Sequence, residues 1–282
     1  QFFKLNLLKG LPKMLKSIKG EKKALKSIIE TYRIDGLISD NRLGIHSKNV
    51  PSVFITHQLQ VLSGNTTWLS TTLHQNIING FDECWVPDNQ GAPNLSGDLG
   101  HVKTHNIPTK YIGPLSRFNK MDTKIKYNVL VLLSGPEPQR TMLEEKLSRA
   151  FAGYDGALLF IKGTVEDEQK RTKKGNTIVY NFMTSEQLEK VLNESELVVS
   201  RSGYTTIMDL AKLNKKAFFF PTPGQFEQVY LAKRLAEQGI APSCQQEDFT
   251  LESLNKIHNY KGLSSFEVNT DFEELFGLFQ SK

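Results

Sequence analysis

The sequence lacks the features that mark disulfide-rich, metal-binding and membrane-spanning proteins. It contains two cysteines, Cys84 and Cys244, which lie far apart and form neither a disulfide framework nor a metal-ligand cluster. Two isolated thiols favour a reducing compartment. No apolar run approaches the ~20 residues that a transmembrane helix needs. The lysine-rich first residues leave no room for the apolar core of a signal peptide. We therefore expect a cytoplasmic protein.

An excess of charge of one sign is also lacking over most of the chain. The 282 residues carry a net charge of +5, and eight lysines fall within residues 1–30, so the remainder is close to neutral. This distribution does not predict nucleic acid as a partner. Hydrophobic residues make up 39% and charged residues 23%. That balance is typical of a globular protein, and the length predicts about two domains.

Residues 2–32 predict a basic amphipathic helix. Apolar residues recur at helical spacing with lysines between them, and we expect Gly10, Pro12 and Gly20 to break the helix into pieces. Such a helix can lie on an anionic membrane surface, or it can be a peripheral helix with a solvated lysine face. The pattern allows both. Because the chain begins at Gln1 without a methionine, we expect an N-terminal piece to be missing.

The rest of the chain contains two series of strands that alternate with helices, a pattern typical of parallel sheets with right-handed crossovers. Residues 87–124, rich in Pro, Gly, Asn and Asp, separate the series and predict loops and an interdomain linker. The first series has apolar segments at residues 35–39, 52–56 and 83–86, and the second at residues 128–133, 157–161, 177–180, 196–200 and 217–220.

The sequence therefore predicts an α/β fold with two doubly wound, Rossmann-like domains that face one cleft. We place the first domain at residues 1–118, with its first βα units absent, and the second at residues 119–282. In such sheets, ligands bind beyond the carboxyl ends of the strands.

The most informative segment is the strand-to-helix junction at residues 197–209. A buried strand runs into Arg201 and Gly203, and a helix begins at once. A helix start presents unpaired N–H groups and the positive end of its dipole, which suits a diphosphate. An ordinary helix with a serine N-cap has the same spacing, so both interpretations stay open. The side chains that could contribute are Arg201, Ser202, Thr205 and Thr206.

A second loop follows the next predicted strand at residues 220–228. The strand ends in a Pro/Gly turn, and Gln225, Glu227 and Gln228 lead into the following helix. Polar side chains at the carboxyl end of a strand fit contacts to sugar hydroxyls. A turn with a solvated helix start is the better explanation of this loop taken alone.

Taken together, the two segments resemble the C-terminal domain of glycosyltransferase family 28. The shared order is Arg-Ser-Gly, a threonine, an acidic residue seven positions after Ser202, a strand that ends in proline, and then Glu-Gln. The resemblance covers about residues 125–245 and is looser in the first domain. It implies the GT-B fold and a nucleotide-sugar donor, with UDP expected.

The resemblance also implies roles for individual residues. Asp209 takes the acidic position that binds the ribose hydroxyls, because a carboxylate can accept two hydrogen bonds from a diol. The family more often has Glu there. The three polar residues of the second loop, Gln225, Glu227 and Gln228, approach the donor sugar and phosphates.

Two further segments of the second domain match the family. Ser134 and Gly135 match the loop after the domain's first strand, where the family usually has two glycines and a serine; here Pro136 follows instead. The resemblance implies that Phe182 and Met183 lie beside the nucleobase, which the family reads partly through backbone groups.

In the first domain, two residues at predicted strand ends are candidates for the acceptor side. His57 lies in an Ile-Thr-His-Gln segment similar to the family's His-Glu-Gln, with the Glu absent. It is a candidate for contacting the sugar or diphosphate, and a hydrogen-bonded histidine at a strand end explains it equally. Asp40 is a candidate acceptor-side group, although Asp is common at such positions.

The catalytic base is not evident from the sequence. An inverting glycosyltransferase needs a base for the acceptor hydroxyl and a means of stabilising the leaving diphosphate. In the family the base is linked to a Gly-rich loop with a histidine, and residues 1–34 contain no such loop. We therefore expect the base to lie outside this chain, with His57 and Asp40 as candidates within it. The family needs neither a metal nor a cofactor, and the sequence has no Asp-x-Asp motif.

The leading hypothesis is a metal-independent, inverting hexosyltransferase that uses a UDP-sugar. A lipid-linked or other glycan acceptor is expected, as is contact with the inner face of an anionic membrane through residues 2–32. Two alternatives remain: a UDP-sugar 2-epimerase of the same fold and a non-catalytic nucleotide-sugar-binding protein. The Arg-Ser-Gly-Tyr segment fits a transferase better than the Ser-Gly-Gly turn of epimerases.

Overall fold

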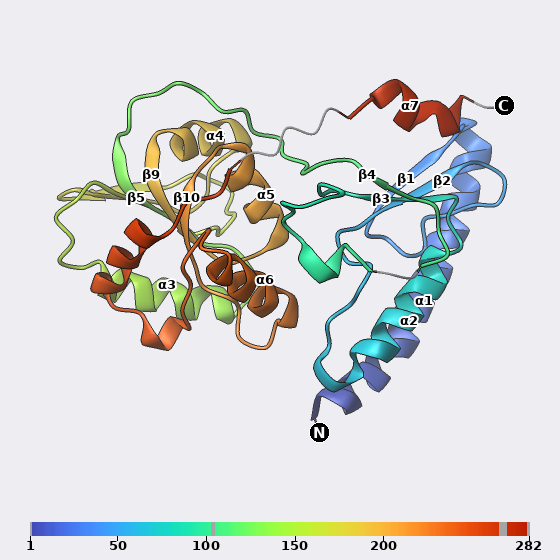
Figure 1. Cartoon of the computed structure of the whole chain (residues 1–282), viewed down its shortest axis with the longest axis horizontal. Helices are drawn as coiled ribbons and strands as arrows, with labels where there is room; N and C mark the ends of the chain where they lie inside the picture. Colours follow the sequence, from blue (N-terminus) through green and yellow to red (C-terminus); the bar gives the residue numbers. More distant parts are fainter. Residues whose placement is uncertain (1, 103–104, 265–269, 281–282) are drawn as a thin grey trace. The chain divides into compact units, whose positions relative to one another are not determined.

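The computed structural model divides the chain into two compact units (Figure 1). Unit 1 consists of Gln1–Pro114 and Glu267–Lys282, and unit 2 of Leu115–Phe266. The structure describes residues 2–102, 105–264 and 270–280, with the side chains of the first helix from residue 16 onward. The division expected at residues 118/119 differs from this one. The larger difference is the C-terminal segment, which joins unit 1.

Unit 1 begins with a single long helix, α1 (Phe2–Tyr32). The expectation that Gly10, Pro12 and Gly20 break it was wrong. An interior glycine costs about 1 kcal/mol relative to alanine and a proline about 3 kcal/mol. Helix formation is cooperative, however, and the leucines and lysines between these positions favour propagation once the helix has formed.

Four parallel strands form the sheet of unit 1, in the order β1-β2-β3-β4. The fourth strand lies within residues 87–124, where we expected only loops and a linker. It was missed because it has three residues, Thr-Lys-Tyr, which are too few and too polar to show a period. The elements are β1 (Leu37–Asp40), β2 (Ser52–Ile55), η1 (Gly64–Thr66), α2 (Thr67–Ile78), β3 (Glu83–Val86), η2 (Gly97–Leu99) and β4 (Thr109–Tyr111).

Alternate residues of this sheet face two different layers, as the period of a strand requires. Phe54 and Cys84 pack in one cluster with Ile78 of α2. Val53 and Trp85, on the opposite face, pack with Leu275 of the C-terminal helix α7 (Phe272–Phe276). The C-terminal segment, which ends in η5 (Gly277–Phe279), therefore belongs to unit 1 because it covers a face of that sheet.

Unit 2 contains six strands in the order β10-β9-β5-β6-β8-β7, of which only the edge strand β7 is antiparallel. The sequence did not predict β7, because its Arg-Thr-Lys-Lys residues are all exposed and carry no apolar signal. The strands are β5 (Tyr127–Leu132), β6 (Leu158–Ile161), β7 (Arg171–Lys174), β8 (Thr177–Tyr180), β9 (Ser195–Ser200) and β10 (Lys216–Phe219).

Helices cover both faces of this sheet (Figure 1). The chain runs from β5 to β6 in one direction, and from β8 through β9 to β10 in the other. Right-handed crossovers therefore place α3 on one face and α4 and α5 on the other. The helical elements are α3 (Gln139–Ala150), α4 (Ser185–Asn193), α5 (Tyr204–Lys212), α6 (Phe226–Glu237), η3 (Gln246–Asp248) and η4 (Leu251–Asn259).

The strand order creates a topological switch point between β5 and β9, where ligands bind in open α/β sheets. The core beneath it includes Val131, Leu143 and Phe218, which are all fully buried. None of the described helices is both long and apolar enough to cross a membrane.

We predict that Gly36→Ala destabilises unit 1. A Cβ at Gly36 would lie 2.1 Å from the Phe279 ring, so the C-terminal segment must shift, at a cost of about 1–3 kcal/mol in the free energy of unfolding. Chemical denaturation measures this loss. The matched control is Gly20→Ala, because a Cβ there meets nothing within 4 Å; that change should stabilise α1 slightly. If Gly36→Ala lowers the free energy of unfolding as much in a Phe279→Ala background as in the wild type, the clash with the Phe279 ring is not its cause.

Candidate functional site

The predicted site segments of unit 2 meet at one edge of its sheet. Because β5, β8, β9 and β10 are parallel, their carboxyl ends lie at the same edge. The junction after β9 is central, since β9 lies between β5 and β10. Ser134 and Gly135 follow β5, Phe182 and Met183 follow β8, Arg201, Ser202 and Gly203 follow β9, and Gln225, Glu227 and Gln228 follow β10.

Arg201 lies at the centre of this edge, with its side chain directed inward and 2% exposed. Its Nη2 donates to the carbonyl of Gln139 at 2.7 Å and to Oε1 of Gln246 at 3.1 Å. Its Nη1 donates to the carbonyls of Phe220 and Pro221 at 3.4 and 3.3 Å. Burial lowers the pKa of Arg201 to about 10, so the guanidinium is charged at neutral pH. It thus joins the loops after β5, β9 and β10.

Ser202 also connects elements within unit 2. Its side chain is fully buried, and its Oγ donates to the carbonyl of Gln228 in α6 at 2.9 Å. The N-cap residue of α5 is Gly203, so no N-cap side chain accepts a hydrogen bond from the first turn of this helix. The alternative of an ordinary helix with a serine N-cap is therefore excluded.

The start of α5 is open. Gly203 has φ −72° and ψ 143°, and a Cβ added there meets no atom within 4 Å. The first turn carries Thr205, which is exposed, and Thr206, which is half-buried. Uncapped N–H groups beside two hydroxyls form an arrangement that can bind an anion.

The loop after β10 is held by its own glutamines. Oε1 of Gln228 accepts from the N–H and the hydroxyl of Thr222 at 2.9 and 2.8 Å. Nε2 of Gln228 donates to Oε1 of Gln225 at 2.7 Å. These bonds fix a turn in which Gly224 has φ +82°, a value that favours glycine. Glu227 is half-buried in the first turn of α6.

Asp209 lies on α5, six positions after Gly203, and is half-buried. The Ser116 hydroxyl donates to its Oδ1 at 2.6 Å. Burial raises the pKa of Asp209, while the Ser116 hydrogen bond and the charge of Arg117 act in the opposite direction. Among the described residues only Ser116 donates to this carboxylate, which leaves acceptor capacity for a diol.

The remaining predicted residues lie on either side of this centre. Ser134 and Gly135 are exposed, and Gly135 has φ +106°, which strongly favours glycine there. Phe182 and Met183 are half-buried. The backbone of Phe182 is already hydrogen-bonded, because its N–H donates to Asn181 and its carbonyl accepts from Gln169.

In unit 1, the two acceptor-side candidates lie at the carboxyl edge of the sheet. Asp40 ends β1 and is exposed, and His57 follows β2 and is half-buried. Sequence reasoning missed a third group, Asp88 and His101, in the loop after β3. The available signal was an aspartate two residues after a buried strand, in a segment interpreted only as loop.

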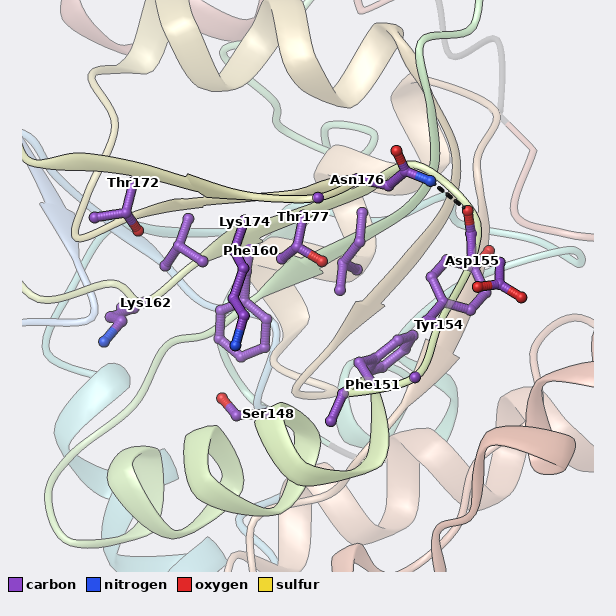
Figure 2. A pocket seen from close by; sticks show the side chains of 15 residues that line it. Ser148, Phe151, Tyr154, Asp155, Phe160, Lys162, Thr172, Lys174, Asn176 and Thr177 are labelled. Atoms are coloured by element: carbon purple, nitrogen blue, oxygen red, sulfur yellow. Dashed lines mark hydrogen bonds between the residues drawn. The ribbon is translucent and has the colours of Figure 1, made fainter.

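A cavity of about 830 Å³ lies elsewhere in unit 2, between α3 and the β7–β8 hairpin. Figure 2 shows Ser148 of α3 and Phe151, which follows the end of that helix, on one side, and Thr172 and Thr177 from the hairpin on the other. It contains none of the predicted site residues. Among the described residues, no group of three His, Cys, Asp or Glu side chains could hold a metal ion.

Replacing Arg201 by methionine should lower the free energy of unfolding by about 3 kcal/mol or more, because it leaves buried carbonyl acceptors without a donor. Chemical denaturation of the whole chain measures the loss. Arg149→Met is the matched control, since the Arg149 side chain is 79% exposed and its replacement should change stability by less than about 0.5 kcal/mol. Equal stabilities of the two variants would contradict the structural role of Arg201.

Comparison with known proteins agrees with this geometry. Residues 140–259 match the model of the glycosyltransferase family 28 C-terminal domain. A curated relative from Haemophilus ducreyi is 24% identical over 246 residues, which are 82% of this chain and 65% of the relative. That relative is a UDP-N-acetylglucosamine--N-acetylmuramyl-(pentapeptide) pyrophosphoryl-undecaprenol N-acetylglucosamine transferase. This chain thus spans just under two thirds of the length of that relative.

Solved structures show the same fold. The structure of Acinetobacter baumannii MurG has a TM-score of 0.55 at 15% identity, over 96% of this chain and 78% of that one. The S. aureus MnaA–UDP structure has a TM-score of 0.59 at 10% identity, over 95% and 83%. The resemblance found in the sequence is confirmed: residues 140–259 form a glycosyltransferase family 28 C-terminal domain, and the chain has the GT-B fold.

Proposed function

We propose that the protein is a hexosyltransferase that moves a sugar from a UDP-sugar to an acceptor hydroxyl, with inversion and without a metal. The observation that carries this proposal is the open, uncapped start of α5 at Gly203, at the centre of the carboxyl edge of unit 2. The family match covers this junction. The donor named in the Haemophilus ducreyi relative is a UDP-sugar.

In this proposal the diphosphate binds the first-turn N–H groups of α5 and the hydroxyls of Thr205 and Thr206. Asp209 accepts hydrogen bonds from the ribose diol. It lies six residues after Gly203, a rise of about 9 Å along a helix, so the proposal places the ribose about that far along α5 from the diphosphate. The half-buried Phe182 and Met183 contact the nucleobase, and Ser134 and Gly135 border the phosphates.

The same groups supply the chemistry of the leaving group. When the bond between the sugar and the diphosphate breaks, negative charge grows on the phosphate oxygens. The dipole and free N–H groups of a helix start stabilise such charge without reorganisation. Arg201 acts as a positioning residue that holds the loops around the diphosphate, and Gln225, Glu227 and Gln228 border the sugar.

The acceptor and the location are further parts of the proposal. The acceptor named in the relative is attached to pyrophosphoryl-undecaprenol, which supports a lipid-linked acceptor here. The described side chains of α1 include the exposed Lys16, Lys19 and Lys23, which suit an anionic membrane at the cytoplasmic face. Co-sedimentation with anionic vesicles tests this contact.

The two alternatives have a direct test. Incubation with UDP-N-acetylglucosamine and no acceptor inverts C2 of the sugar only if the protein is an epimerase. A protein that binds UDP but neither epimerises nor transfers the sugar is the non-catalytic alternative.

UDP should raise the melting temperature of the wild-type protein, and Asp209→Ala should weaken UDP binding by roughly 10- to 100-fold, since it removes hydrogen bonds to a charged acceptor. Because burial raises the pKa of Asp209, wild-type affinity should fall as the pH is lowered through that raised pKa, and the Ala variant should lack this fall. Thermal shift and calorimetry measure the UDP affinity and its dependence on pH.

The control is Asp155→Ala, at an exposed position, which should keep the wild-type affinity for UDP. An unchanged UDP affinity in Asp209→Ala would exclude the ribose role of Asp209.

Gly203→Ala should separate binding from stability. Its φ of −72° suits any residue, and the added Cβ meets nothing within 4 Å, so the melting temperature without ligand should stay unchanged. The methyl group would instead occupy the space that the diphosphate needs. Affinity for UDP should fall at least tenfold while affinity for uridine changes little. The control is Gly153→Ala, where an added Cβ also meets nothing within 4 Å. If Gly203→Ala binds UDP as tightly as the wild type, the diphosphate does not bind at Gly203.

A further inference from the structure

The cavity between α3 and the β7–β8 hairpin follows from the topology of unit 2. Right-handed crossovers place α3, which connects β5 to β6, on one face of the sheet, and α4, which connects β8 to β9, on the other. Residues 162–170, which lead from β6 to the hairpin, form no helix. The connections of β7 and β8 therefore supply no helix for the face that α3 covers at β5 and β6, and a cavity of about 830 Å³ remains there.

Side chains from three adjacent strands form the floor of this cavity. They lie in two rows across the sheet, each with one residue from β6, one from β8 and one from β7: Phe160–Val179–Thr172 and Leu158–Thr177–Lys174. The residues from β6 are buried, those from β8 are half-buried and those from β7 are exposed. The floor thus changes from apolar beside α3 to polar and cationic at the edge of the sheet.

The end of the cavity beyond α3 is also apolar. Phe151 and Tyr154 both line it, and their rings meet edge to face with centroids 5.5 Å apart and planes at 88°. Between them lie Ala152 and Gly153, whose small side chains leave the space open, and a Cβ added at Gly153 meets nothing within 4 Å. Aromatic groups beside an open space provide a surface on which an apolar chain can be buried.

The cationic side of the cavity has an ammonium group that no described carboxylate neutralises. Figure 2 shows the Lys174 side chain extending from the hairpin into the cavity, and it forms no ion pair or hydrogen bond with any described residue. Lys162, which also lines the cavity, differs because its Nζ lies 2.8 Å from Oε1 of Glu144. The carboxylate of Asp155 lies at the far end, beside Tyr154 (Figure 2). The charge near Lys174 is therefore complementary to an anion.

We propose that this cavity binds a small amphiphilic anion, an alkyl chain with one carboxylate head group. The head group pairs with the Lys174 ammonium at the edge of the sheet, where the Thr172 hydroxyl is a further donor. The chain crosses Val179 toward Phe151. The volume lies within the range of about 300–1,000 Å³ that is usual for small-molecule sites with an apolar lining and few polar groups. This site contains none of the donor-site residues and does not depend on the proposed function.

Calorimetry with decanoate, below the concentration at which it forms micelles, tests the chemistry of the ligand. We expect decanoate to bind at millimolar concentration or below. Octanoate should bind up to about tenfold more weakly, because it buries two fewer CH₂ groups. Acetate has the head group without the chain, and decyltrimethylammonium has the chain with the opposite charge. Neither should bind measurably at the concentration that saturates the protein with decanoate.

Lys174→Met tests the role of the ammonium, because it removes the charge and keeps an apolar side chain of similar length. Affinity for decanoate should fall about fivefold or more, the upper range for an exposed ion pair. The matched control is Lys173→Met in the same strand. Lys173 is also exposed, but it does not line the cavity, since neighbouring strand residues point to opposite faces. It should bind decanoate like the wild type.

Ser148→Trp tests the location. Ser148 is an exposed residue of α3 that lines the cavity, so an indole ring there should occupy the cavity without disturbing the core. We expect at least a tenfold loss of decanoate affinity with an unchanged melting temperature. Arg149→Trp, at the next residue of the helix, is exposed and outside the cavity. It should leave the affinity unchanged.

Four results would overturn the proposal. The first is the absence of decanoate binding at millimolar concentration, and the second is equally tight binding of decyltrimethylammonium. The third is equal decanoate affinity in Lys174→Met and Lys173→Met. The fourth is wild-type affinity in Ser148→Trp. None of these measurements uses UDP, so they decide the proposal whatever the outcome for the donor site.

Discussion

The carboxyl edge of unit 2 depends on the buried guanidinium of Arg201. The Arg201 guanidinium donates to carbonyls and an amide from segments that are far apart in the sequence. A buried charge is costly unless it is hydrogen-bonded, so the loops adopt an arrangement that supplies acceptors to both terminal nitrogens, Nη1 and Nη2. Arg suits this task because its planar fork donates in several fixed directions at once. Ser202 and Gln228 extend the same network into α6.

This arrangement explains why the start of α5 can remain open. The side chains nearest to it in sequence, Arg201 and Ser202, are both directed into the fold, and the next residue is a glycine. Among the described residues, no side chain caps the helix at Gly203, and the N-terminal end of α5 presents the positive end of its dipole to a ligand. In the Arg-Ser-Gly motif, the side chains of Arg201 and Ser202 are thus buried in the fold, and Gly203 leaves space at the start of the helix. The residue types alone do not predict these directions.

Much of the fold followed from the sequence, because long apolar runs such as residues 128–133 and 196–200 are specific to buried parallel strands. The short polar strands β4 and β7 could not be predicted, since neither carries a hydrophobic period. The placement of α7 was also out of reach: its packing on Trp85 joins residues that are far apart in the sequence. At the site, segment positions were predicted, but the inward direction of Arg201 and the contact of Asp88 with His101 depend on tertiary structure.

The packing of Phe279 against Gly36 has a consequence for the order in which the chain folds. Unit 2 is an insertion within unit 1, since residues on both sides of it belong to the unit 1 structure. During synthesis all of Leu115–Phe266 leaves the ribosome before the segment that covers Val53 and Trp85. Domains usually fold from the N-terminus onward. Here the second unit can complete its core first, while the apolar face of the first sheet stays uncovered until residues 275–279 emerge.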